Sequence, residues 1–192
     1  MCQVLNDDIY LNDLKNALEN VSESYVLYNQ KDQRGNNCIK TEERIFAYEL
    51  YHQFRKIMDD DNKYTNLYMS GEQVKNCNLF QGESLNGMKH IIPDMVLHET
   101  IAENSGKQVF YVEIKMSNNQ ALLKDLYKLT KLKKENKLHF KYYVFIVVGM
   151  NKCELCSKID RRRKNTHIDE DIICFCFKDG KADMFPIKNM KK

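Results

Sequence analysis

The chain has 192 residues, of which 43% are hydrophobic and 30% are charged, so it can bury a core and its composition excludes a disordered protein. With only two prolines and seven glycines it does not resemble a linker-rich protein, and we expect one domain over residues 1–192. The net charge of +3 is too small to indicate nucleic acid by itself.

The first 60 residues are predicted to form two helices separated by a loop. Apolar residues at helical spacing predict a helix from about Asp8 to Val21. The polar segment Gln30 to Asn37 contains a glycine and is predicted to be a loop. A second helix is predicted from about Thr41 to Met58, with Thr41 as its cap and with Phe46 and Phe54 on its buried face.

Three strands are expected next. The first lies near Leu67 to Val74. The other two are Ile91 to Glu99 and Gln108 to Met116, and the turn signal Asn104-Ser105-Gly106 between them predicts a hairpin.

The remainder of the chain is predicted to alternate between helix and strand. Leucines at helical spacing predict a helix from about Asn119 to Glu135. The continuous run Tyr142 to Val148 fits a strand that is buried on both faces. Short strands are expected near Ile172 to Phe177 and near Ala182 to Pro186. A hairpin followed by a helical crossover predicts an α/β fold with a central mixed β-sheet flanked by helices.

Three charged residues stand where a buried strand would not require them. Period-two alternation places Glu113 and Lys115 on one face of their strand, together with Val109 and Tyr111. Asp94 follows Pro93, and the predicted hairpin would bring Asp94 close to Glu113. Two carboxylates can bind a hard cation such as Mg²⁺ or Mn²⁺, which lowers the pKa of a bound water. A lysine beside them can orient or deprotonate that water and can stabilise a developing anion.

This pattern resembles the signature of the PD-(D/E)XK nuclease superfamily, whose members have a restriction-endonuclease-like core. Pro93-Asp94 is followed after 18 residues by Glu113-Ile114-Lys115, and the strings PDMVLH and VEIK resemble a small bacterial and phage branch of that superfamily. So does the Asp-x-x-Lys-Leu element at Asp125, Lys128 and Leu129. The resemblance covers roughly residues 41–150, with residues 151–192 as a C-terminal extension of the same domain. It implies metal-dependent hydrolysis of phosphodiester bonds.

The superfamily often places a further glutamate on the helix before the sheet. Projected at about 100° per residue, Glu43 falls near the centre of the buried face of that helix, whereas Glu42 and Glu49 fall to one side. Glu43 is therefore the predicted third acidic residue, although it would also suit the positive end of the helix dipole without any catalytic role. Glu72 is a weaker candidate on the first strand.

Two other groups of residues suggest partners. Arg161, Arg162, Arg163 and Lys164 form a basic run that is expected to lie in a loop and to contact nucleic acid, although a solvated face explains such a run equally well. A CxxC at Cys153 and Cys156, followed by His167, Cys174 and Cys176, resembles half of a zinc site. Small buried apolar cysteines are the favoured alternative to structural zinc.

The predicted function is a Mg²⁺- or Mn²⁺-dependent nuclease acting on DNA, with Asp94, Glu113 and Glu43 as metal ligands and Lys115 beside them. The alternatives are a surface ion pair with no function, and a nuclease fold that binds nucleic acid or protein without cleaving it. A homodimer is a further possibility that the sequence does not decide. The N-terminal sequence lacks the features of a signal peptide and the longest apolar run cannot span a bilayer, so a cytoplasmic protein without a membrane partner is expected.

Overall fold

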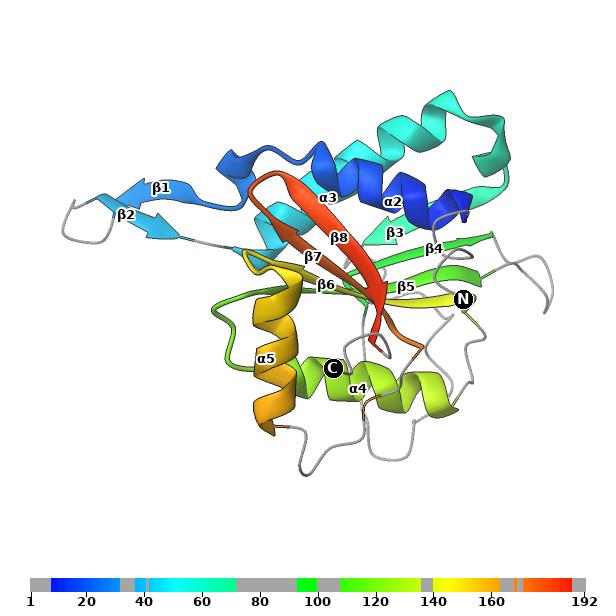
Figure 1. Cartoon of the computed structure of the whole chain (residues 1–192). Helices are drawn as coiled ribbons and strands as arrows, with labels where there is room; N and C mark the ends of the chain where they lie inside the picture. The colour runs from blue at the N-terminus through cyan, green and yellow to red at the C-terminus, as the bar shows by residue number, and fades with distance from the viewer. Residues whose placement is uncertain are drawn as a thin grey trace.

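Six strands form one mixed sheet whose spatial order, β3-β4-β5-β6-β7-β8, is also the order of the strands in the chain (Figure 1). Their bounds are β3 Leu67–Gly71, β4 Met95–Glu99, β5 Gln108–Met116, β6 Tyr142–Val148, β7 Ile173–Lys178 and β8 Lys181–Pro186. Strands β5, β6 and β7 are parallel, and every other neighbouring pair is antiparallel. The computed structural model describes residues 8–31, 37–40, 42–71, 93–99, 108–135, 140–162, 168 and 171–187.

Helices cover both faces of this sheet (Figure 1). The helices are α2 Ile9–Glu19, α3 Glu43–Asp60, α4 Leu122–Glu135 and α5 Lys152–Arg162, with short 3₁₀ turns at Glu23–Tyr25 and Asn62–Tyr64. Helices α2 and α3 pack with one face of the sheet in a first apolar cluster, and α4 and α5 pack with the other face in a second. The predicted α/β class, with a central mixed sheet flanked by helices, is therefore confirmed.

Two helical crossovers explain why the centre of the sheet is parallel. Helix α4 connects β5 to β6, and α5 connects β6 to β7. A crossover of this kind is needed to join parallel neighbours. The first crossover and the β4–β5 hairpin were predicted, while α5 was not. Its sequence is mostly polar, and among its apolar residues only Leu155 and Ile159 are buried, so few apolar residues mark this segment as a helix.

Helix α3 carries an apolar stripe that faces the sheet. Phe46, Leu50 and Phe54 are fully buried at i, i+4 and i+8, which confirms the predicted buried face. The helix begins at Glu43 and its N-cap position is Glu42, so the predicted cap at Thr41 is wrong in position. The side chain of Glu42 makes no capping hydrogen bond.

The segment predicted as a loop before α3 is in part a β-hairpin. Strands β1 (Tyr28–Lys31) and β2 (Asn37–Lys40) pair antiparallel, and Figure 1 shows them extending away from the six-stranded sheet. The polar composition of residues 30–37 hid these strands, because hairpin pairing depends on backbone bonds more than on apolar periodicity. The residues between the two strands lie outside the described part of the chain.

The predicted alternation along β5 holds only beyond its first residues. Tyr111 packs in the cluster under α4, whereas Val109 packs in the opposite cluster with Phe110. Opposite the start of β5, the strand register shifts between Leu97 and His98 of β4. Such an irregularity turns neighbouring side chains to the other face of the sheet. Including Val109 in the face of Glu113 and Lys115 was therefore wrong.

Polar bonds tie both ends of α2 to the sheet. Asp8 caps the helix by accepting bonds from the backbone N–H groups of Tyr10 and Leu11, and its second oxygen accepts a bond from Lys141 Nζ at 2.7 Å. Burial would raise the pKa of Asp8, but the Lys141 bond and other bonds to this carboxylate hold the pKa below its ordinary value. At the other end, Glu19 Oε1 accepts a bond from the backbone N–H of Ala182 at 3.2 Å.

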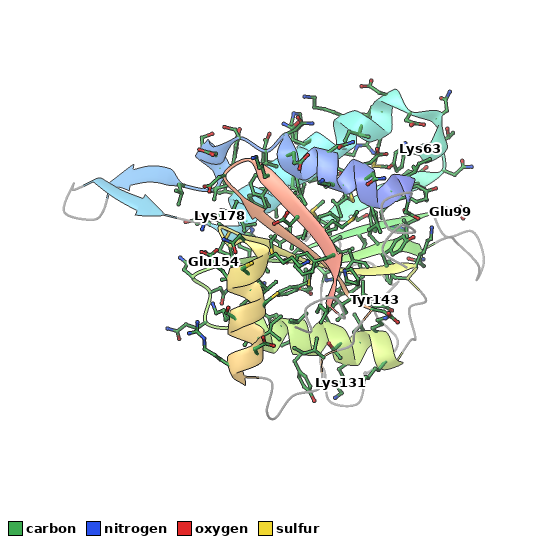
Figure 2. All side chains as sticks on the ribbon, viewed as in Figure 1. Lys63, Glu99, Lys131, Tyr143, Glu154 and Lys178 are labelled. Carbon is green, nitrogen blue, oxygen red and sulfur yellow. The ribbon has the colours of Figure 1, made fainter. Side chains whose placement is uncertain are left out.

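An ion pair also joins α5 to the end of β7. Lys178 Nζ lies 3.0 Å from Glu154 Oε1, and Figure 2 shows the two labelled side chains close together at the start of α5. The carboxyl ends of β5, β6 and β7 meet at this edge of the sheet, because the three strands run in the same direction.

Candidate active site

Lys115 is a buried cation near the carboxyl end of β5, with 8% of its surface exposed. Its Nζ lies 2.5 Å from Oε1 of Glu43, which is the first residue of α3. The same Nζ lies 4.0 Å from Oδ2 of Asp94, directly before β4. The structure therefore brings three of the four predicted catalytic residues into direct contact around one ammonium group.

The backbone of the β4–β5 pair fixes the orientation of Asp94. Its Oδ2 accepts a hydrogen bond from the backbone N–H of Ile114 at 2.7 Å, and its own N–H donates to the carbonyl of Val112 at 3.1 Å. Continuing the strand register by one pair from Met95 and Val112 places Asp94 opposite Glu113. The predicted proximity of these two carboxylates follows from that pairing.

Asp125, in the first turn of α4, belongs to the same cluster although it was not a predicted site residue. Its Oδ2 lies 3.8 Å from Lys115 Nζ, and its Oδ1 lies 2.7 Å from Nζ of Lys128. The signal that could have identified it is the Asp-x-x-Lys-Leu element noted in the sequence. Helix α4 follows β5 directly and lies over the face that carries Glu113, so the first turn of the helix falls beside the end of the strand.

Asn119 makes a further contact from the segment between β5 and α4. Its Nδ2 lies 3.4 Å from Oε2 of Glu43, and its own side-chain oxygen accepts a bond from the N–H of Ala121 at 2.8 Å. Both oxygens of Glu43 therefore contact groups on or directly after β5. Nothing in the type or the spacing of Asn119 marked it in the sequence.

Burial and like charges make Glu113 a weak acid. Desolvation and the negative charges of Asp94 and Asp125 raise the pKa of Glu113 to about 8, and the charge of Lys115 offsets only part of this effect. The hydroxyl of Tyr111 lies 3.4 Å from Oε1 of Glu113. A divalent cation would favour the ionised carboxylate, because metal binding releases a proton from its ligands.

Lys115 is held in its charged form. Burial alone would lower its pKa, but the hydrogen bond to Glu43 and the charges of Asp94 and Glu43 raise the pKa above its ordinary value. The lysine is thus suited to donate hydrogen bonds and to stabilise an anion. It is poorly suited to remove a proton from water, which was one of the two roles expected from the sequence.

The raised pKa of Glu113 predicts that its ionisation destabilises the metal-free protein. The folded-state pKa lies above the ordinary value of 4.5, so the folded protein favours the protonated form of Glu113. The stabilisation from this protonated side chain is complete below pH 4.5 and is lost as the pH rises through about 8. The neutral Glu113→Gln variant avoids that loss. In EDTA we expect it to unfold at a higher temperature than the wild type at about pH 8.5.

The pH series provides the control for this prediction. The difference between Glu113→Gln and the wild type should shrink as the pH falls toward about 4.5, where both side chains are neutral. Thermal unfolding followed by circular dichroism at each pH measures it. A wild type that is the more stable protein at about pH 8.5 would show that this carboxylate is not destabilised by its surroundings.

The oxygen atoms of Asp94 and Glu113 are suitable ligands for Mg²⁺. This cation is commonly held by one or two carboxylates, with waters and substrate phosphate completing its shell. Within the described residues, no three or more His, Cys, Asp or Glu side chains are grouped so that they could hold a metal ion. The predicted third ligand, Glu43, is instead engaged with Lys115, which leaves Asp94 and Glu113 as the carboxylates of the predicted set that could hold a cation.

Comparison with known proteins gives no indication of the function of this chain. The chain matches no protein-family model, no curated protein and no solved structure at a significant level. None of the helices in the described ranges has the length and the apolar character needed to cross a membrane. Inference about function therefore rests on the side chains around Lys115.

The other predicted residues lie apart from this cluster or outside the described ranges. Arg161 is exposed in the last turn of α5, which also contains Arg162, so the expectation that the basic run begins in a loop is wrong for these two residues. Arg163, Lys164 and Glu72 lie outside the described residues. Lysine and arginine are favourable at a helix C-terminus, which explains the position of this run without a ligand.

The cysteines are distributed in a way that favours packing. Cys174 and Cys176 are buried on β7, and burial raises the pKa of both thiols, which disfavours the thiolate form that zinc requires. Cys153 is exposed on α5, while Cys156 is half-buried against the cluster that contains the β7 cysteines. His167, the fifth member of the predicted zinc set, lies outside the described residues.

Proposed function

We propose that this protein is a nuclease that hydrolyses phosphodiester bonds, with DNA as its substrate and Mg²⁺ or Mn²⁺ as its cofactor. One observation carries the proposal: Lys115 is buried among the carboxylates of Glu43, Asp94 and Asp125, beside Glu113. A surface ion pair would not need four acidic residues from three different elements and the residue before a fourth. Perturbed ionisable groups gathered in this way are typical of catalytic sites.

The order of elements supports a restriction-endonuclease-like core. Helix α3 is followed by three antiparallel strands, β3 to β5, and α4 then crosses to the parallel strand β6. The sequence resemblance to PD-(D/E)XK nucleases implies this order and this position for the Asp, Glu and Lys residues. Strand β7 and helix α5 extend the sheet beyond that pattern.

Each residue has a role in the proposed mechanism. Asp94 and Glu113 would hold the cation, which supplies a Lewis acid for the phosphate and lowers the pKa of water. Lys115, which stays protonated, donates hydrogen bonds toward the oxyanion that develops on the phosphate. Glu43 and Asp125 hold the ammonium group of Lys115 in place and balance its charge before substrate binds.

Metal-dependent cleavage tests this proposal. The purified 22.8 kDa protein is incubated with labelled single-stranded and double-stranded DNA in Mg²⁺, in Mn²⁺ and in EDTA. We expect cleavage with either cation and none in EDTA, and the activity should elute with the protein across a sizing column. Absence of cleavage under all conditions, or cleavage that persists in EDTA, would contradict the proposal.

A module that binds without cleaving is the second candidate. It is favoured by the close ion pair between Lys115 and Glu43, which engages one of the predicted metal ligands. Retention of labelled DNA without any product in Mg²⁺ and Mn²⁺ would identify it. In that case the cluster would serve stability and specificity, as buried ion pairs do in some proteins.

A further inference from the structure

A cleft of about 350 Å³ adjoins the Lys115 cluster on the side of α3. Glu43 and Asp94 belong both to the Lys115 cluster and to the lining of the cleft, so the cleft lies directly beside the candidate active site. Arg44, Tyr48 and Tyr51 line it from α3, and Gly71 lines it from the end of β3. Its volume lies at the lower end of the range for ligand pockets, which is about 300–1,000 Å³.

The charges around the cleft determine which part of a nucleotide can enter it. Glu43 and Asp94 place two carboxylates at one end, and Lys115 offers one positive charge between them, so the remaining negative charge disfavours a phosphate group inside the cleft. Arg44 is exposed beside them, and its positive charge attracts a phosphate group that lies outside the cleft. An uncharged, planar group is therefore favoured inside, with its phosphates held at the entrance.

The two tyrosines provide an aromatic wall. Tyr51 is fixed, because its hydroxyl donates a hydrogen bond to the backbone carbonyl of Met69 at 3.1 Å. Tyr48 is 50% exposed, and no ring contact or hydrogen bond engages it within the described part of the chain. An aromatic ring in this situation is a platform on which a nucleobase can stack.

Gly71 keeps the opposite wall open. It shares the parity of Leu67 and Met69 on β3, which pack in the cluster under α3, so a side chain at position 71 would point toward the cleft. The nearest neighbour of a Cβ added here is the carbonyl of Asp94 at 3.8 Å, which is an ordinary contact. The Cβ of a larger residue therefore meets no backbone clash at this position.

We propose that this cleft holds one unstacked nucleobase of the substrate, next to the phosphate that reaches Lys115. This inference rests on the proposed nuclease function and narrows the substrate class to single-stranded or unpaired DNA. A base that is paired within a continuous duplex cannot enter, because both of its faces are already stacked. The protein would then favour DNA ends, flaps or single strands over intact duplex.

Binding to an oligonucleotide that contains 2-aminopurine tests the inference without requiring cleavage. The fluorescence of this base reports stacking, and the protein is kept in EDTA so that the DNA stays intact while Lys115 can still contact the phosphate. We expect the single strand to bind at least about 10-fold more tightly than the same sequence in a duplex. Under these conditions, Tyr48→Ala should weaken single-strand binding by about 5- to 150-fold, while Tyr48→Phe should preserve it.

Two further variants make the test specific to the cleft. Gly71→Val fills the cleft from the opposite wall and should weaken single-strand binding while Tyr48 is intact. Tyr68→Ala is the matched control. Tyr68 is exposed to a similar degree as Tyr48, and it lies on the same strand as Gly71 but points to the opposite face of the sheet. The control variant should bind single strands as the wild type does.

The outcomes separate this inference from the nuclease proposal. Tight, Tyr48-dependent binding of single strands by a protein that never cleaves would uphold the base site and reject the nuclease. Equal binding of duplex and single strand, with no effect of Tyr48→Ala or Gly71→Val, would overturn the base site even if the wild type cleaves DNA. The absence of any binding to DNA would overturn it as well.

Discussion

Replacing Lys115 by methionine is expected to slow metal-dependent DNA cleavage by about 100- to 1,000-fold. Methionine retains an unbranched stem of similar length, so the buried position stays filled while the charge is lost. The ammonium of Lys115 lies within 4.0 Å of carboxylate oxygens of Glu43, Asp94 and Asp125. Without it, the cluster has no cation to direct at the developing phosphate anion. Single-turnover cleavage of a labelled oligonucleotide in Mg²⁺ measures the loss.

Two comparisons distinguish a chemical effect from unfolding. Lys115→Arg keeps the charge and should melt close to the wild type, but a planar guanidinium cannot replace a compact ammonium in this cluster, so its rate should stay low. Lys181→Met removes an exposed lysine of β8 and should cleave as the wild type does. Full cleavage by a folded Lys115→Met protein would place the active site elsewhere.

Truncating Phe110 to alanine is expected to lower the free energy of unfolding by about 3–5 kcal/mol. Phe110 is fully buried in β5, and its ring lies 6.2 Å from Phe54 of α3, 6.0 Å from Tyr142 of β6 and 6.5 Å from Tyr10 of α2. One side chain thus joins two helices to two strands. Since whole domains are stable by about 5–15 kcal/mol, the variant should retain little stability.

Urea unfolding followed by circular dichroism measures this effect. The control is Tyr68→Ala, which removes a ring that is 46% exposed on the edge strand β3 and should change stability by no more than about 0.5 kcal/mol. A loss below about 1 kcal/mol for Phe110→Ala would mean that the packing between α2, α3 and the sheet is not as described.

Most of the sheet was predictable because apolar runs carry its signal. The bounds predicted for β5 and β6 match the structure, since β6 is a continuous β-branched and aromatic segment and β5 contains such a segment from Val109 to Val112. Helix α5 and the β1–β2 hairpin were missed. Their sequences are polar, and their formation depends on what they pair with or cover, which local periodicity does not report.

The candidate site was predictable where residue type and strand position coincide. Asp94, Glu113 and Lys115 are charged residues beside buried strands, and that conflict with their surroundings marks them in the sequence. Asp125 lies in a helix rich in charged side chains, so its type does not stand out. Its contact with Lys115 depends on where α4 crosses the sheet, and the sequence does not report that position.

The hydrogen bond between Glu19 and Ala182 joins positions 163 residues apart in the chain. The apolar face of α2 contacts β7 and β8, which follow the other four strands of this sheet in the chain. Before these two strands are made, α2 can pack with α3 and with β5, but the part of its face that contacts β7 and β8 has no partner. The nascent chain therefore exposes this part of an apolar face until β7 and β8 follow, which favours aggregation or chaperone binding. A chain shortened before β8 would keep that liability permanently.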